Sequence, residues 1–395
     1  MENYSNCYLI LLITILSMFG LISSDIYVPA LPAITHFFAV SEGEITFSIS
    51  IYLIALAFSQ LVYGFLIENF GAKHVLITGI IIYIFSSLAC AISNTYHLFI
   101  IFRLIQGIGA ASGLVIGRYI ISICFPKEKS AYIYAIIYPF VSLSPAIAPL
   151  IGGYLSTYFH WQSNFIFIAI FGLFALFLTY KILPISFSQQ PSSRQKTKVC
   201  LKESISILFK DINFWIYTCI VCFIYQAWFI YLTQSTFIFK NIYFLSAKQA
   251  GWLYLPLSFG IIIANYSTRK LLRFWNSDHI ILFGLISFFI GGILFIYPRP
   301  SLAYFILSMF IVSLANGSSL SLAVAAAINS KHNQTAIASG ILGFLQIGSA
   351  GIISYLISHI FGQNIETLGH SIFVLSSLSV ILFIFKLYKY KSFFL

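Results

Sequence analysis

Asp25 lies at the end of the first long apolar stretch of this sequence, and two prolines follow it at Pro29 and Pro32. An ionisable side chain at membrane depth is costly, so it is by default a candidate for function. A buried carboxyl group of this kind could exchange a proton for a cationic or polar substrate. The alternative is that Asp25 caps a helix end at the outer headgroup layer.

Arg103 begins a second polar cluster, several residues into another apolar stretch, where a guanidinium must face protein or water. Gln106 follows about one turn later and shares roughly the same helix face. The small residues between Gly107 and Gly113 would let another helix pack closely. The alternative is an arginine that extends to the outer interface. If Asp25 and Arg103 are close, burial disfavours the carboxylate and the guanidinium favours it, which suits proton exchange.

Prolines and glycines mark the segment 144–153, which contains Pro145, Pro149, Gly152 and Gly153. Two prolines four residues apart remove two backbone hydrogen bonds and predict a bent helix. The glycine pair permits close approach of a neighbouring helix. Bent helices are common in membranes, so this pattern is only moderately specific for function.

The segment 64–73 carries Gly64, Glu68, Gly71 and Lys73. A turn glycine with charges at fixed offsets could connect the cytoplasmic ends of neighbouring helices. An ordinary charged loop would have a similar composition.

The composition predicts that all of these residues belong to a membrane protein. Of the 395 residues, 60% are hydrophobic and 8% are charged, and the mean hydropathy is +0.96. A soluble domain normally carries about 25% charged residues. Apolar stretches close to the ~20 residues that span a bilayer recur along the whole chain. The first stretch has no basic leader and no cleavage site, so we expect a retained helix rather than a signal peptide.

The apolar pattern predicts an all-α integral membrane protein with twelve transmembrane helices in two six-helix bundles. The expected helices cover residues 8–33, 45–67, 75–93, 97–122, 130–156, 161–183, 213–238, 248–269, 278–297, 301–328, 335–360 and 368–388. A polar segment rich in Gln, Ser and Lys separates the sixth helix from the seventh and predicts a flexible linker. We therefore expect an N-terminal bundle at 1–183, a cytoplasmic linker at 184–212 and a C-terminal bundle at 213–395.

The basic residues predict the orientation in the membrane. With the N-terminus in the cytoplasm, most of the 21 Lys and Arg residues fall on the inner side, and only Lys240, Lys248 and Arg299 fall in outer loops. Both termini are then cytoplasmic. The net charge of +11 therefore indicates topology rather than binding of nucleic acid. The six cysteines form no framework, so we expect neither disulfides nor a metal site.

Together, these helices and motifs resemble the major facilitator superfamily, and more narrowly its drug:proton antiporters of the bicyclomycin-resistance and chloramphenicol-efflux (Bcr/CflA) type. The resemblance spans the whole chain, and the segment from Asp25 to Pro32 is its most specific part. It implies that Asp25, with Tyr27 beside it, takes part in proton coupling and cation recognition. Arg103 and Gln106 match the motif of the fourth helix that is associated with proton coupling. The segment 145–153 matches the "antiporter" motif of the fifth helix.

Two charged motifs depart from the family pattern. Where the loop motif usually has Asp-Arg and then Gly-Arg-Arg, this chain has Glu68-Asn69 and then Gly71-Ala72-Lys73. Arg118 matches the first position of the family's Arg-x-x-x-Arg-Asp, but the last two charges are absent. In the family these charges hold the inner gate shut, so the resemblance implies a weaker gate or a substitute contact through Glu68 and Lys73. The residues expected at this gate are Gly64, Glu68, Gly71, Lys73 and Arg118.

Polar side chains within apolar helices of the second half are candidates for the lining of a substrate cavity. They are Tyr225, Gln226, Trp228, Tyr231, Gln234, Asn316 and Gln346. Tyr and Trp are also common anchors at the membrane interface, so each assignment has a structural alternative.

The expected function is proton-coupled secondary transport across a bacterial inner membrane, by alternating access between two bundles. We expect a monomer that exports drugs or small polar or cationic compounds, uses the proton gradient and needs no cofactor. The alternative within transport is an importer or exporter of a metabolite such as an amino acid, peptide or siderophore. An integral membrane enzyme is a remote alternative, because the sequence contains neither H-E-x-x-H nor an aspartate-rich pair.

Overall fold

The computed structural model describes residues 2–124, 144, 147–183, 210–297, 301–328 and 335–390 of the chain. Within these ranges it leaves out the side chains of residues 2–7, 68, 122, 335–337 and 390. All regular elements in the described residues are helical, so the predicted all-α fold is confirmed.

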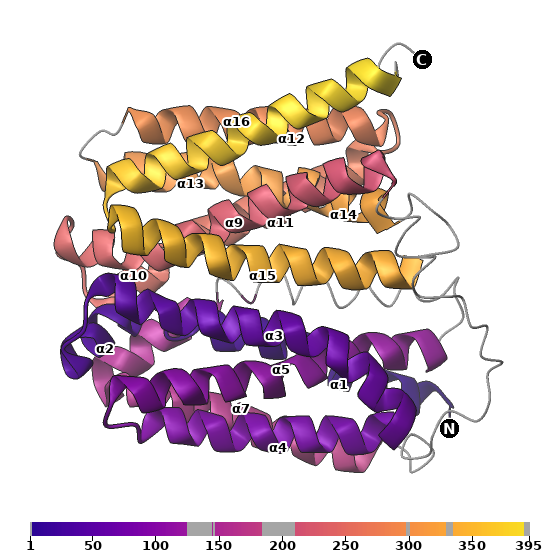
Figure 1. Ribbon diagram of the computed structural model, residues 1–395, viewed down its shortest axis with the longest axis vertical. Coiled ribbons are helices and arrows are strands. Elements are labelled where there is room, and N and C mark those ends of the chain that lie inside the picture. Colours follow the sequence, from indigo (N-terminus) through magenta and orange to yellow (C-terminus); the bar gives the residue numbers. More distant parts are fainter. Residues whose placement is uncertain are drawn as a thin grey trace. The chain divides into compact units, whose positions relative to one another are not determined.

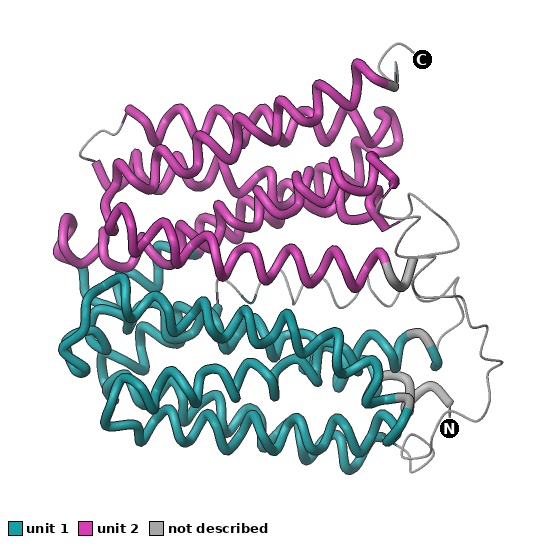
Figure 2. The backbone as a smooth tube through the Cα atoms, in the orientation of Figure 1, with its two compact units in different colours: residues 1–195, 245–254 teal, residues 196–244, 255–395 magenta. Residues whose placement is uncertain are grey.

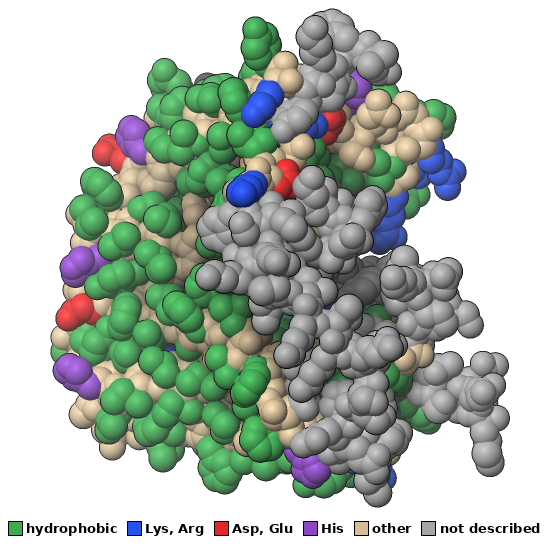
Figure 3. Space-filling view, turned by 45° about the vertical axis from the view of Figure 1, so that its right-hand side comes forward, with side chains coloured by type: hydrophobic (Ala, Val, Ile, Leu, Met, Phe, Trp, Pro, Cys, Tyr) green, Lys and Arg blue, Asp and Glu red, His purple; other side chains and the backbone are tan. Residues whose placement is uncertain are grey.

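Ten helical segments among the described residues are long and apolar enough to cross a membrane. They are Tyr8–Phe38, Glu42–Ile67, Ala72–Ala91, Tyr96–Ile121, Gln162–Ile182, Ile212–Asn241, Ser277–Ile296, Leu302–Ile328, Ala338–Phe361 and Ile365–Lys389. Of the other two expected helices, 130–156 lies partly outside the described residues and 248–269 is divided into two pieces. Hydrophobic side chains cover most of the described surface in Figure 3, as expected where helices face lipid.

The helices form two compact units (Figures 1 and 2). Unit 1 comprises Met1–Gln195 and Leu245–Tyr254, and unit 2 comprises Lys196–Phe244 and Leu255–Leu395. The short segment Leu245–Tyr254 therefore groups with unit 1, although it follows the expected linker by more than thirty positions in the chain.

Unit 1 is organised around α5 (Tyr96–Cys124), which packs against α1 (Glu2–Asp25), α3 (Glu42–Phe70) and α4 (Ala72–Ala91). α7 (Gln162–Ile182) packs on α4 and α1. The remaining pieces are the 3-10 turn η1 (Val28–Ala30), α2 (Leu31–Phe38), a helix over residues 147–159 and α10 (Ala247–Trp252). Three helices thus pack around α5 and the polar residues that it carries.

The first membrane span is broken just after Asp25. α1 ends at this residue, η1 has Pro29 in its first positions, and α2 begins next to Pro32. Proline fixes φ and lacks an N–H group, so it begins helical turns readily but does not continue a preceding helix. The last carbonyl groups of α1 therefore lack some of their helical partners. Asp25 stands at this break.

Unit 2 is organised around α9 (Ile212–Asn241), which packs against α14 (Ser321–Ile328), α15 (Thr335–Phe361) and α16 (Ile365–Tyr390). α12 (Ser277–Ile296) packs on α16 and on α13 (Leu302–Ala315), and α11 (Leu255–Leu271) packs on α13. α13 and α14 are joined by the π-helical turn η3 (Asn316–Leu320). Such turns are frequent at functional sites.

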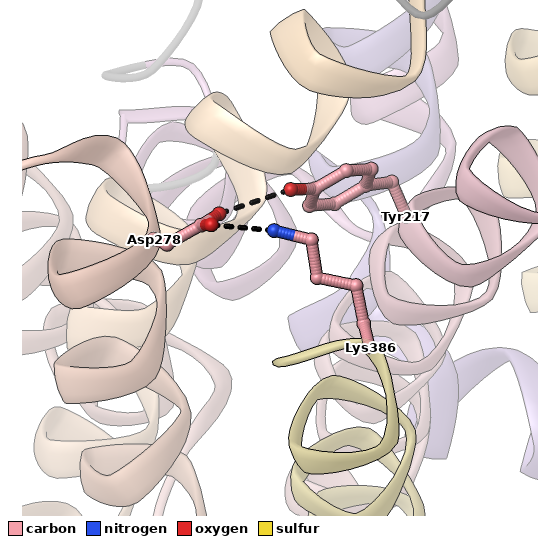
Figure 4. Close-up of polar contacts among 3 residues, drawn as sticks. All are labelled: Tyr217, Asp278 and Lys386. Atoms are coloured by element: carbon pink, nitrogen blue, oxygen red, sulfur yellow. Dashed lines mark hydrogen bonds and ion pairs between the residues drawn. The ribbon is translucent and has the colours of Figure 1, made fainter. Parts of the chain in front are cut away.

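An ion pair and a hydrogen bond, both to Asp278, connect three helices of unit 2 (Figure 4). Lys386 Nζ of α16 lies 2.5 Å from Asp278 Oδ2 of α12, and the hydroxyl of Tyr217 in α9 donates to Asp278 Oδ1 at 3.0 Å. Asp278 is in the first turn of α12, where the helix dipole favours an acid. The cluster fixes the start of α12 against the end of α16.

A related contact occurs in unit 1. Lys73, in the first turn of α4, is largely buried and donates to the carbonyl of Leu183 at 2.5 Å. Leu183 is the C-cap of α7, whose terminal carbonyls favour a cation. α4 and α7 correspond to the expected third and sixth helices, and α12 and α16 to the ninth and twelfth. In each unit a lysine therefore connects the third helix of that unit to its sixth helix. The lysine is on the third helix in unit 1 (Lys73) and on the sixth helix in unit 2 (Lys386).

Candidate functional site

Asp25 is buried, with 1% of its surface exposed. The hydroxyl oxygen of Ser24 lies 2.8 Å from Asp25 Oδ1 and 2.9 Å from the carbonyl oxygen of Leu21. A hydroxyl group has one proton and can donate to only one of these acceptors at a time. Both contacts can be hydrogen bonds at the same time if Asp25 is protonated. The carboxyl group of Asp25 then donates to the hydroxyl of Ser24, and that hydroxyl donates to the carbonyl of Leu21. The end of α1 therefore provides a place for a proton on Asp25.

Arg103 is fully buried in α5 and donates to four acceptors. Its Nε donates to the carbonyl of Ser48 in α3, and its Nη1 donates to the carbonyl of Ser23 in α1, both at 3.3 Å. Nη1 also donates to Gln106 Oε1, and Nη2 donates to the hydroxyl of Tyr27 at 3.1 Å. One guanidinium thus joins α1, α3 and the turn that follows α1.

Aromatic rings also surround this guanidinium. Arg103 Cζ lies 4.4 Å from the ring centre of Tyr27, 4.3 Å from that of Tyr52 and 5.8 Å from that of Phe165. A desolvated cation over an aromatic face gains about 2 kcal/mol. Aromatic faces and backbone carbonyls therefore stabilise the buried charge in place of a carboxylate.

Asp25 and Arg103 do not form an ion pair. An ion pair is present in unit 2, between Asp278 and Lys386. Asp25 and Arg103 are connected through the end of α1 instead, where the carbonyl of Ser23 binds Arg103 and the hydroxyl of Ser24 binds Asp25. A change at Asp25 can reach Arg103 through two consecutive residues of α1.

Hydroxyl groups complete the network around Arg103. Gln106 Nε2 donates to Ser87 Oγ at 2.7 Å, and the hydroxyls of Ser23 and Tyr83 are hydrogen-bonded to each other. Sequence reasoning did not single out the hydroxyl residues of this network, which are Ser23, Ser24, Ser48, Tyr52, Tyr83 and Ser87. Ser and Tyr are common in apolar helices, so their types alone were no signal. The signal that the sequence did offer was the spacing of Tyr83 and Ser87, which lie one helical turn apart in α4.

Glycines allow α5 to carry these polar groups so close to its neighbours. A Cβ atom at Gly107 would overlap the carbonyl of Tyr52 in α3, and one at Gly109 would overlap the backbone of Tyr83 in α4. The small residues that follow Arg103 therefore set the short distances between α5 and its acceptors, as the sequence predicts for close helix packing.

The glycine pair of the predicted helix-bend motif packs against two different backbone segments. A Cβ atom at Gly152 would overlap the carbonyl of Ile26, the residue after Asp25. A Cβ atom at Gly153 would overlap the carbonyl of Ala247 in α10. Pro145 of the same motif lies outside the described residues. The two glycines thus bring the broken end of α1 and the segment Leu245–Tyr254 to the same helix.

α10 makes two further contacts with this helix. Gly251 packs on the carbonyl of Pro149. Lys248 Nζ donates to the hydroxyl of Tyr158 at 3.0 Å and lies 4.6 Å from the ring centre of Tyr154. The hydrogen bond with Tyr158 raises the pKa of Lys248 above its ordinary value. These contacts explain why the segment groups with unit 1.

Four of the five residues expected at a cytoplasmic gate lie between the second half of α3 and the first turn of α4, and the fifth, Arg118, is on α5. Gly64 is in the second half of α3 with open space beside it, and Gly71 forms the turn between the helices with φ of 79°. Lys73 binds the end of α7, and Arg118 is exposed on α5. The side chain of Glu68 lies outside the described residues, so a contact between Glu68 and Lys73 stays a prediction.

The expected cavity residues of unit 2 lie on three elements. α9 carries Tyr225, Gln226, Trp228, Tyr231 and Gln234, η3 begins with Asn316, and α15 carries Gln346. Gln234 is fully buried, and its side-chain nitrogen and oxygen have no hydrogen-bond partner among the described residues. The side-chain nitrogen of Asn316 is also buried without a hydrogen-bond partner among the described residues. Unsatisfied buried amides are costly, so these two are the strongest members of the set for binding a polar ligand.

A model of the Major Facilitator Superfamily matches residues 11–355 of this chain. An uncharacterized transporter of Rickettsia felis is 26% identical over 93% of this chain and 94% of its own length. A bicyclomycin resistance protein homolog of Haemophilus influenzae is 23% identical over 74% of this chain and 73% of its own length. A crystal structure of a D-xylose–proton symporter has the same fold, with a TM-score of 0.75, 14% identity, and 96% of each chain covered.

Proposed function

This chain belongs to the Major Facilitator Superfamily, and on that premise we propose that it is a proton-coupled exporter of drugs or other small polar or cationic compounds. The observation that carries the proposal is the buried Asp25 with the Ser24 hydroxyl beside it, at the break in the first span. The bicyclomycin resistance protein homolog among its relatives supports an antibiotic-like substrate.

In the proposed cycle Asp25 exchanges its proton for substrate. When Asp25 is protonated, Ser24 donates to Leu21 and the end of α1 keeps all of its hydrogen bonds. When the proton leaves, Ser24 must turn toward the carboxylate, and Leu21 loses that donor. Because Ser23 holds Arg103 in the same turn of α1, loss of the proton changes the contact between α1 and α5. The conformational change begins at this contact.

The proton gradient can supply the free energy for export. A membrane potential of about 100 mV is equivalent to ~2.3 kcal/mol for each charge moved across the bilayer. At 1.4 kcal/mol for each factor of ten, that free energy supports a roughly fifty-fold substrate gradient before any pH difference is added. The proposal therefore includes no nucleotide and no other cofactor.

The proposal also includes the location and assembly of the protein. It places the chain in a bacterial inner membrane as a monomer, with both termini in the cytoplasm. The excess of Lys and Arg in the loops of that side supports this orientation.

Transport by purified protein in proteoliposomes tests the proposal. An imposed pH gradient, acidic on the side that corresponds to the cell exterior, should drive exchange of cationic drugs. Asp25→Asn keeps the shape and neutrality of the protonated acid but cannot release a proton, so it should abolish pH-driven exchange and preserve the fold. Glu366→Gln, which removes an exposed acid in the first turn of α16, is the matched control and should transport normally.

The substrate panel separates this proposal from metabolite transport. It should contain cationic drugs, amino acids, short peptides and siderophores. Exchange of a metabolite but not of drugs would replace the substrate assignment and keep the role of Asp25. Full pH-driven exchange by Asp25→Asn would remove Asp25 from the coupling mechanism.

A further inference from the structure

A basic and aromatic cluster lies where α11 is joined to α12 in unit 2. Arg269 and Lys270 are exposed in the last turn of α11, and Arg273 is exposed in the turn that follows. The next two residues are Phe274 and Trp275, of which 82% and 49% of the surface is exposed. Aromatic side chains flanked by cations at the end of a membrane span are typical of the headgroup layer of a bilayer.

The turn between the two helices is compact. The backbone N–H of Arg273 donates to the carbonyl of Lys270, and those of Phe274 and Trp275 both donate to the carbonyl of Leu271. These backbone hydrogen bonds fix the conformation of the turn. They therefore keep its cations and its two aromatic residues close together.

A surface cavity of about 380 Å³ begins at this turn and continues along α12. Its polar end is formed by Asn276 and His279, next to Phe274 and Trp275. Its apolar part is formed by Leu282, Phe283 and Ile286. The exposed Phe283 and Ile286 continue to Ile290 at helical spacing, so the apolar surface extends along the membrane span.

The cations beside this cavity have no acidic partner among the described side chains. In the described residues, Asp278 is the nearest acid in the chain, and it is already paired with Lys386 and bound by Tyr217. Arg269 and Arg273 form no ion pair with any described acid, and Lys270 lies over the ring of Tyr266, 4.6 Å from its centre. The turn that leads into the cavity therefore carries an excess of positive charge, and the apolar groove begins directly after it.

We propose that this cluster is a binding site for an anionic phospholipid, with the headgroup at Arg269, Lys270 and Arg273 and an acyl chain along Phe283, Ile286 and Ile290. Charge complementarity selects an anionic headgroup, since basic residues close to a bilayer surface each favour anionic lipid. The apolar groove along a membrane span matches an acyl chain. The inference concerns the lipid partner of unit 2 and does not depend on the direction of transport or on its substrate.

Quenching of Trp275 fluorescence by brominated lipids tests the site in the full-length protein. The protein is reconstituted in bilayers that contain brominated phosphatidylglycerol or brominated phosphatidylcholine at equal mole fraction. The contribution of Trp275 is the difference between wild type and Trp275→Phe. We expect quenching by phosphatidylglycerol to exceed that by phosphatidylcholine by about twofold or more at low salt.

The double variant Arg269→Gln/Arg273→Gln should remove this preference. Lys240→Gln, which removes an exposed cation from the end of α9, is the matched control and should keep it. Salt is the second measurement, in case the double variant does not fold. At about 1 M salt the screening length falls to about 3 Å, so the preference of the wild type should largely disappear.

Three results would overturn the inference. The first is equal quenching by the two lipids in the wild type at low salt. The second is a preference that survives in the folded double variant or persists at high salt. The third is quenching by either lipid that falls as the protein-to-lipid ratio rises, because a second copy of the chain would then cover the cavity.

Discussion

The guanidinium of Arg103 donates to the backbone carbonyl of Ser23 at 3.3 Å, two residues before Asp25. Ser23 lies in the last turn of α1, where carbonyl groups lack helical partners and the helix dipole favours a cation. Arg103 therefore acts as a side-chain cap for a helix that ends inside the membrane. The same helix end carries the carboxyl group that we propose exchanges protons.

We expect Arg103→Lys to lower transport about tenfold or more, because an ammonium group cannot reproduce the planar fork that reaches three elements. Each hydrogen bond to a charged group contributes roughly 1.5–3 kcal/mol, so the free energy of unfolding should fall by about 2 kcal/mol or more. Thermal unfolding in detergent and exchange in proteoliposomes measure the two effects. His97→Gln, at an exposed position of the same helix, should change neither. Wild-type transport by Arg103→Lys would show that the fork is dispensable.

Gly152→Ala should destabilise unit 1 by about 1–3 kcal/mol, because the added methyl group overlaps the carbonyl of Ile26 and the backbone after Asp25 must move. Gly64→Ala is the matched control, since Gly64 is in a helix interior with open space beside it. Alanine there should be neutral or stabilising by roughly 0.5–1 kcal/mol. Thermal unfolding of both variants is the measurement. Equal stability of the two would contradict the packing described for Gly152.

Asp278 and Lys386 should show a coupling energy of about 1–3 kcal/mol in a double-mutant cycle. Lys386→Met leaves a partly buried acid unpaired, whereas Asp278→Asn combined with Lys386→Met removes both charges. The single variant should therefore be less stable than the double variant. The charge-swapped variant, Asp278→Lys combined with Lys386→Asp, should restore stability only in part, because a lysine at the start of α12 opposes the helix dipole. Additive effects of the single substitutions would show that the pair contributes nothing.

Lys248→Gln combined with Tyr158→Phe should loosen α10 from the helix at residues 147–159, because the hydrogen bond and the ring contacts of Lys248 are lost. Ala250 is a buried residue of α10, so an Ala250→Cys reporter should react faster with a membrane-impermeant thiol reagent when α10 loosens. The exposed Lys240 provides the control variant, Lys240→Gln, which should leave the rate of labelling unchanged. An unchanged rate in the double variant would mean that the glycine contacts alone hold α10.

The sequence predicted the membrane fold because twenty-residue apolar stretches leave few alternatives in a bilayer. It also singled out Asp25, Arg103 and Gln106, because charged and amide groups are rare in such stretches. Tyr27 was added through the family motif that contains Asp25. The structure places the side chains of Tyr27 and Gln106 on Arg103. The roles of these residues in coupling stay predictions.

Other features depend on three-dimensional packing that no local pattern records. A serine in an apolar helix usually donates to a backbone carbonyl of its own helix, as Ser86 does. The sequence does not distinguish Ser86 from Ser87, which also binds Gln106 of α5. The pairing of Asp278 with Lys386 joins residues more than a hundred positions apart. Asp278 is at the start of α12 and Lys386 is near the end of α16, so no local spacing connects them. Long-range pairs of this kind become visible once the helices are arranged in space.

The absence of an ion pair between Asp25 and Arg103 has a consequence for selectivity. An arginine guanidinium is always charged in proteins. Asp25 and Arg103 together are therefore formally cationic when Asp25 is protonated and neutral when it is ionised. A positively charged drug is repelled by the first state and tolerated by the second. In the export that we propose, proton and cationic substrate can then exclude each other through the electric field alone, without direct contact between the substrate and Asp25.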